Sequence, residues 1–113
     1  MNKEVKQLLD RIYDNPIALW GKPSLERLVD FVGGYQYCMY VRDGMHPNSP
    51  VSGYMQDIVL EYYDVKKEKN FRKKYWSKII IFCEGSDEKA FYKFYELLEL
   101  YEKKYGSAEE LDS

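Results

Sequence analysis

Apolar residues recur at spacings of three and four along most of the chain, with polar residues between them. This spacing places side chains on one face of a helix. Asn15-Pro16 marks the end of one such stretch, Ser24 and Ser86 can cap the first turns of two others, and Gly106 can end the last. The pattern predicts helices over residues 3–14, 24–42, 51–62 and 86–105.

Two further segments are less regular. Residues 17–20 indicate a short irregular stretch that leads to a turn at Gly21. Residues 75–83 contain three consecutive isoleucines, which favour a strand by propensity. Because the chain offers no obvious second strand for pairing, we expect a short buried helix there, with a short strand at 78–83 as the alternative.

Five helical segments with short connections predict an all-α fold, a compact single-domain bundle of about five helices. The longest loop is expected at residues 43–50, which are dense in turn-forming residues. We expect residues 1–106 to form one helical domain and residues 107–113 to form a frayed acidic C-terminal tail.

A glycine pair, Gly33-Gly34, lies inside the second helical stretch. Each glycine there costs about 1 kcal/mol relative to alanine, so the pair needs a reason. Our interpretation is close approach of a neighbouring helix, which a missing side chain permits; a helix break or hinge is the alternative.

The composition fits one soluble globular domain. The chain has 113 residues, of which 45% are hydrophobic and 32% charged, and its net charge of −2 argues against nucleic-acid or membrane binding by the whole surface. The longest apolar run, residues 79–83, is far shorter than the ~20 residues that span a bilayer. Since the first residues also lack the apolar segment of a signal peptide, we expect a cytoplasmic protein without membrane contact.

Little in the chain points to catalysis or to a cofactor. Cys38 and Cys83 lie among apolar residues, far from any second cysteine or histidine, so we expect buried thiols and neither a disulfide nor zinc ligands. His46 is the only histidine and lies in a turn-rich loop without a nucleophilic partner in view. No phosphate-binding glycine loop occurs. We therefore predict no catalytic, cofactor-binding or metal-binding residue, and a protein that is not an enzyme.

Charge is distributed unevenly over the second half of the chain. Residues 64–78 carry a net charge of +5, and residues 84–113 carry −5. The basic segment 66–78, with Phe71, Tyr75 and Trp76 among its lysines, suits phosphate contacts and base stacking. A solvated loop whose aromatic rings turn toward the core explains the same residues.

Acidic residues and spare tyrosines indicate a partner-binding face. Asp57, Glu61 and Asp64 are spaced four and three apart, which places them on one helix face, beside Tyr62 and Tyr63. Twelve tyrosines exceed what a core of this size needs, and tyrosine is enriched at binding interfaces. The predicted partner-binding residues are Asp57, Glu61, Tyr62, Tyr63 and Asp64; a simple solvated helix face is the alternative.

Several stretches resemble a family of small bacterial proteins. Residues 15–28 carry a proline, a glycine five residues later and then Ser-Leu-x-x-Leu, followed by Phe31 and Gly34-Tyr35; residues 76–80 and 88–98 are also similar. These proteins are similar to immunity-type partners encoded beside secreted toxins. The resemblance implies a non-enzymatic protein-binding module that neutralises a cognate toxin by masking its active site.

Two alternative functions remain from the sequence. One is a small nucleic-acid-associated or regulatory protein that uses the basic segment 66–78. The other is a structural subunit of a larger assembly. The sequence does not determine the oligomeric state.

Overall fold

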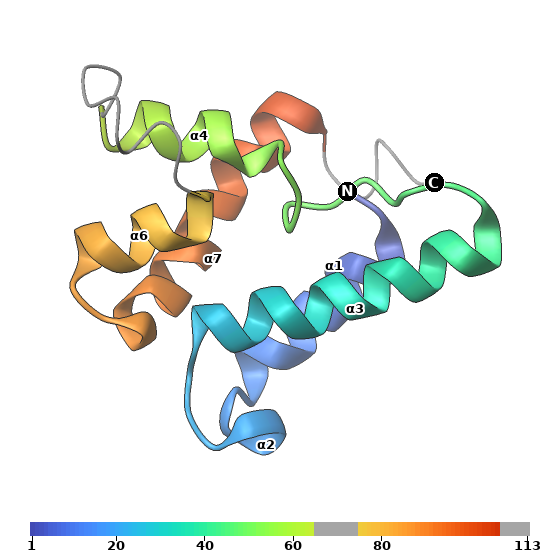
Figure 1. Ribbon diagram of the computed structural model, residues 1–113, viewed down its shortest axis with the longest axis horizontal. Coiled ribbons are helices and arrows are strands. Elements are labelled where there is room, and N and C mark those ends of the chain that lie inside the picture. The colour runs from blue at the N-terminus through green and yellow to red at the C-terminus, as the bar shows by residue number, and fades with distance from the viewer. Residues whose placement is uncertain (65–74, 107–113) are drawn as a thin grey trace.

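The computed structural model describes residues 1–64 and 75–106, and regular structure in these ranges is entirely helical. This confirms the predicted all-α bundle of about five helices. Within these ranges five helices have eight or more residues, and α2 is a single turn; Figure 1 shows their arrangement. The elements are α1 (Lys3–Asp14), α2 (Ile17–Trp20), α3 (Leu25–Asp43), α4 (Met55–Tyr62), α6 (Trp76–Glu84) and α7 (Asp87–Tyr105).

Both less regular segments are helical. The isoleucine-rich segment forms α6, which buries Trp76, Ile79 and Ile80 against the core and ends at Gly85 in a left-handed conformation with φ 91°. The prediction of a short buried helix is therefore confirmed, and the strand alternative is wrong. The stretch expected to be irregular is the helical turn α2, which Gly21 ends in the same left-handed way.

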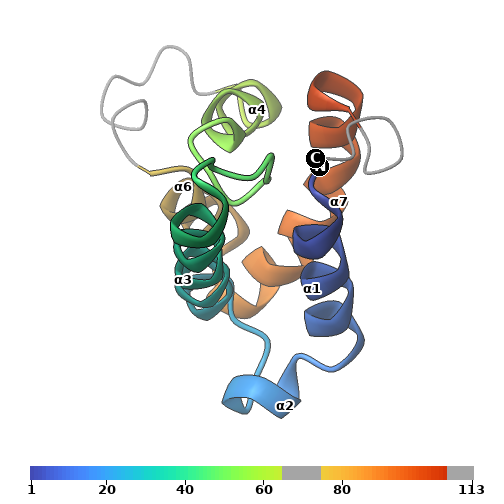
Figure 2. The ribbon, with the colours of Figure 1, turned by 90° about the vertical axis from the view of Figure 1, so that its right-hand side faces the viewer.

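The core is built around α7. Its buried residues recur at spacings of three and four, as the sequence pattern predicts, and the helix packs against α6, α3 and α4. The ring of Trp76 from α6 stacks on Phe94 with 5.6 Å between centroids. Figure 2 shows α1 and α7 on one side of the molecule and α3 on the other. The buried side chains of α7 are Ala90, Phe91, Phe94, Leu97, Leu98 and Tyr101.

The N-termini of α3 and α7 are joined by one carboxylate. Ser24 caps α3 as predicted, because its hydroxyl oxygen accepts a hydrogen bond from the Arg27 amide at 3.1 Å. The same hydroxyl donates to the Asp87 carboxylate in the first turn of α7. The second oxygen of Asp87 accepts from the Glu26 amide at 3.0 Å, so Asp87 serves the N-termini of two helices whose dipoles both favour a negative charge.

Two expectations about α3 and α6 are wrong. A Cβ atom added at Gly33 or Gly34 meets no atom within 4 Å, so no neighbouring helix approaches the pair, and α3 continues through it without a break. Cys38 and Cys83 are exposed free thiols rather than buried ones. Both errors have the same cause, because α3 and α6 carry apolar residues on their outer faces as well as toward the core.

No helix within residues 1–64 and 75–106 is long and apolar enough to cross a membrane.

Asp87→Ala should lower the free energy of unfolding by about 1–2 kcal/mol. Two donors at the start of α3, the Ser24 hydroxyl and the Glu26 amide, lose their acceptor in this variant. Urea denaturation measures the change. Glu88→Ala is the matched control, since Glu88 lies in the same first turn but is exposed. Its effect should stay at or below about 0.5 kcal/mol, and equal effects at both positions would show that the contact between helices contributes nothing.

Gly34→Ala should raise the free energy of unfolding of dilute protein by about 0.5–1 kcal/mol, because alanine fits the open space and favours the helix. Gly85→Ala should have the opposite sign. Position 85 is equally open, but its φ of 91° strains a residue with a Cβ atom. Destabilisation by Gly34→Ala in dilute solution would contradict the packing described for α3.

Candidate functional site

The predicted acidic face on α4 is less continuous than the spacing suggests. Asp57 and Glu61 are exposed on α4, but the helix ends at Tyr62. Asp64 lies beyond this end in a left-handed conformation with φ 51°. The expectation that all three carboxylates share one helix face is therefore wrong, since the helical spacing stops before the third.

The two tyrosines of this region already have partners within the chain. The Tyr63 hydroxyl donates to the Glu84 carboxylate at 2.6 Å, and burial together with this bond raises the pKa of Tyr63 well above its usual value. The Tyr62 hydroxyl accepts from the Lys93 ammonium at 3.1 Å. Glu61 and Tyr62 also line a small hollow of about 290 Å³ that includes Lys103 and Lys104 of α7, and these lysines offset the local negative charge.

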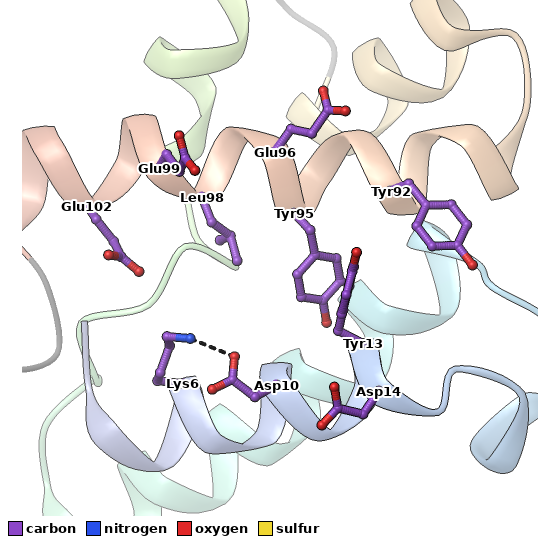
Figure 3. Close-up of a pocket in the computed structure, with 10 residues that line it drawn as sticks. All are labelled: Lys6, Asp10, Tyr13, Asp14, Tyr92, Tyr95, Glu96, Leu98, Glu99 and Glu102. Carbon is purple, nitrogen blue, oxygen red and sulfur yellow. Dashed lines mark hydrogen bonds and ion pairs between the residues drawn. The ribbon is translucent and has the colours of Figure 1, made fainter.

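A larger and more acidic groove lies between α1 and α7 (Figure 3). Its volume is about 680 Å³. Residues from α1 recur at helical spacings of three and four and line one wall, and residues from α7 line the other. The groove is lined by Lys6, Asp10, Tyr13, Asp14, Tyr92, Tyr95, Glu96, Leu98, Glu99 and Glu102.

Three tyrosine rings occupy one end of this groove. The Tyr13 ring lies 4.7 Å from that of Tyr95 and 6.3 Å from that of Tyr92, in an edge-on arrangement with the latter. The Tyr95 hydroxyl donates to the Leu9 carbonyl at 2.6 Å and so joins α7 to α1. Tyr13 and Tyr92 are 49% and 44% exposed, and their hydroxyls have no hydrogen-bond partner among the described residues. Tyr95 is thus held in place by its hydrogen bond, whereas the exposed rings of Tyr13 and Tyr92 can contact a ligand.

The groove carries a clear excess of negative charge. Its lining has five carboxylates and one lysine, a net charge of −4, which becomes −3 when Lys93 is included. Lys6 pairs with Asp10 at 2.6 Å, and Lys93 pairs with Glu96 at the same distance. Asp14, Glu99 and Glu102 have no ion-pair partner in the described part of the chain.

The Tyr95 hydroxyl responds to this charge. Its pKa is raised well above the usual value, first by burial and then by the nearby Asp10 and Asp14 carboxylates. Both carboxylates come from α1, the helix that the Tyr95 hydroxyl contacts through its bond to the Leu9 carbonyl.

Carboxylates beside exposed aromatic faces suit a lysine or arginine side chain. The carboxylates can accept charge-assisted hydrogen bonds, and a tyrosine ring can contact the cation through its face. His46 lies elsewhere and stacks on Tyr40 with 4.2 Å between ring centroids. Within the residues that the structure describes, no group of three or more histidine, cysteine or acidic side chains is arranged to hold a metal ion.

The nucleic-acid alternative depends on a segment that is mostly outside the described residues, since 66–74 fall in the gap at 65–74. In its described part, Trp76 is completely buried and is not available for base stacking. Tyr75 is 47% exposed. Lys78 forms an ion pair with Glu26 of α3.

Comparisons with protein-family models, with curated proteins and with solved structures found no match to this chain.

Tyr95→Phe should lower the free energy of unfolding at neutral pH by about 1 kcal/mol, because the hydrogen bond to Leu9 is lost. The difference from wild type should shrink as pH rises above 10. The raised pKa keeps the folded hydroxyl protonated while the unfolded one ionises, so this contribution of Tyr95 is present below pH 10 and is lost above it. Denaturation at neutral and alkaline pH measures both effects.

Tyr92→Phe is the control for this change, because its hydroxyl has no partner in the described structure and its ring is exposed. Its unfolding free energy should stay within about 0.5 kcal/mol of wild type. A difference between Tyr95→Phe and wild type that grows with pH would contradict the burial and charge described for the groove.

Proposed function

We propose that this chain is a non-enzymatic protein-binding module of the immunity type, which binds a basic surface of a cognate toxin and covers the toxin's active site. The observation that carries the proposal is the groove between α1 and α7, with its five carboxylates and its exposed Tyr13 and Tyr92 rings. The proposal moves the partner contact from the residues expected on α4 to this groove.

The groove supplies the two contributions that such a complex needs. Asp14, Glu99 and Glu102, which have no ion-pair partner among the described residues, attract a basic surface over a distance and so speed the encounter. The Tyr13 and Tyr92 rings then add contact area at low entropic cost, because aromatic side chains have few rotatable bonds. A toxin that acts on nucleic acid has a basic active-site surface, which is complementary to this groove.

The scaffold is suited to masking rather than to chemistry. Tyr95 joins the two walls through its bond to the Leu9 carbonyl, so the groove is organised before a partner arrives. Preorganised walls lower the entropy lost on binding. An inhibitor of this kind needs a stable complementary surface and no catalytic group of its own.

Capture of the tagged chain's partner from its native lysate, at physiological salt and after nuclease treatment, is the first step of the test. We expect one stoichiometric protein that slows growth when expressed alone and that the chain neutralises on co-expression. Replacement of Asp14, Glu99 and Glu102 by lysine should weaken binding to this protein by at least about 100-fold and abolish the protection.

The matched control carries the same change of charge on α4 and beyond it, with Asp57, Glu61 and Asp64 replaced by lysine. This variant should bind within about tenfold of wild type and still protect. If the α4 variant lost more binding than the groove variant, the partner contact would lie in the α4 region. Recovery of nucleic acid alone, lost on nuclease treatment, would reject the immunity function and favour the basic segment 66–78.

A further inference from the structure

The helix α3 has a second apolar face, opposite the one that it buries. Its sequence from 31 to 41 contains eleven residues without a charge. Leu28, Val32 and Met39 point into the core. On the other side, spacings of three and four bring together Phe31, Gly34, Tyr37, Cys38 and Val41, and Met45 follows just beyond the helix end.

This outer face is well exposed. Tyr37 is 66% exposed, Val41 65% and Met45 74%, while Phe31 is 42% exposed. These residues together present roughly 500 Å² of apolar surface, which is at the upper end of what a monomeric protein leaves open. An exposed apolar patch of this size is often a contact surface, so this face indicates a contact that one chain does not supply.

Gly34 adds a feature of shape to the same face. An alanine there would fit the open space and favour the helix, so the glycine brings no advantage to the chain on its own. The missing side chain leaves a notch on this face, flanked by Phe31 one turn before it and by Tyr37 and Cys38 one turn after it. Such a notch allows another helix to approach more closely, since the distance between packed helices depends on the side chains at the contact.

We propose that this outer face of α3, formed by Phe31, Gly34, Tyr37, Cys38 and Val41 together with Met45 just beyond the helix, packs against the same face of a second copy of the chain in a two-fold dimer. A two-fold axis brings one patch against itself, so a charge-free surface meets a charge-free surface. Two such patches bury about 1,000 Å² in total, the area at which specific interfaces begin.

The charges that frame the face fit this arrangement. Arg27 and Asp30 lie near the N-terminal end of α3, and Arg42 and Asp43 lie at its C-terminal end. Each end has both signs, and Arg42 already pairs with Asp43 and with Glu4. Two antiparallel copies therefore meet without strong repulsion between like charges. The small area implies a weak dimer, with a dissociation constant in the micromolar range or above.

Sedimentation equilibrium from micromolar to millimolar protein tests the dimer with the full chain. Val41→Lys should raise the dissociation constant at least about tenfold, because an ammonium group would be buried in an apolar contact. Ile17→Lys is the matched control. Ile17 is also β-branched and aliphatic and is 62% exposed, against 65% for Val41, but it lies on α2 outside the face. This control should change the constant by less than about twofold.

Circular dichroism should show native helix content for both variants, since neither side chain is in the core and lysine favours a helix more than valine does. A monomer at every concentration would overturn the proposal, and so would equal effects of the two lysines. An open series of larger oligomers would also overturn it, since a two-fold contact uses the same patch on both copies and therefore stops at the dimer. A monomer whose binding to the captured partner is weakened by Val41→Lys would assign the face to that partner instead.

Discussion

Burial of the apolar stripe of α7 is the constraint on which the other features of the molecule depend. Trp76 of α6 stacks on Phe94, and α3 and α4 pack along the same helix. This packing fixes the rotation of α7 about its axis, so the side that holds Tyr92, Glu96 and Glu99 lies away from the core. The Tyr95 hydroxyl then brings α1 against α7 through the Leu9 carbonyl. The acidic groove is therefore a consequence of how α7 is buried.

The helices could be predicted because their apolar spacing and caps are local features. Ser24 and Ser86 cap the N-termini of α3 and α7 as expected, and the isoleucine segment forms a helix because it finds core contacts without a partner strand. Periodicity does not reveal whether an apolar position has a neighbour in space. Periodicity therefore predicts packed surroundings for Cys38 and Gly34, whereas the structure places both on the open side of α3.

The candidate site also depends on which residues are neighbours in space, and the sequence pattern does not reveal this. Asp57, Glu61 and Asp64 are close in sequence, and their spacing predicts one acidic face. The helix ends before Asp64, however, and Tyr63 is already bonded to Glu84. The groove combines Asp14 with Glu99 and Glu102, which are more than eighty residues away in the sequence. The excess of acidic residues in 84–113 is a sequence feature that points to the α7 wall of the groove. The second wall follows only from the packing of α1 against α7.

The two proposed contacts rely on different physical forces, so they respond differently to the solution. Contacts in the groove depend on the charge of its carboxylates and weaken as salt screens that charge. Contacts on the outer face of α3 depend on apolar burial, which salts that are excluded from protein surfaces strengthen. The two surfaces share no residue, since the groove is formed by α1 and α7. A dimer through α3 would therefore leave both grooves free, and each dimer could hold two partners or two sites of one partner with added avidity.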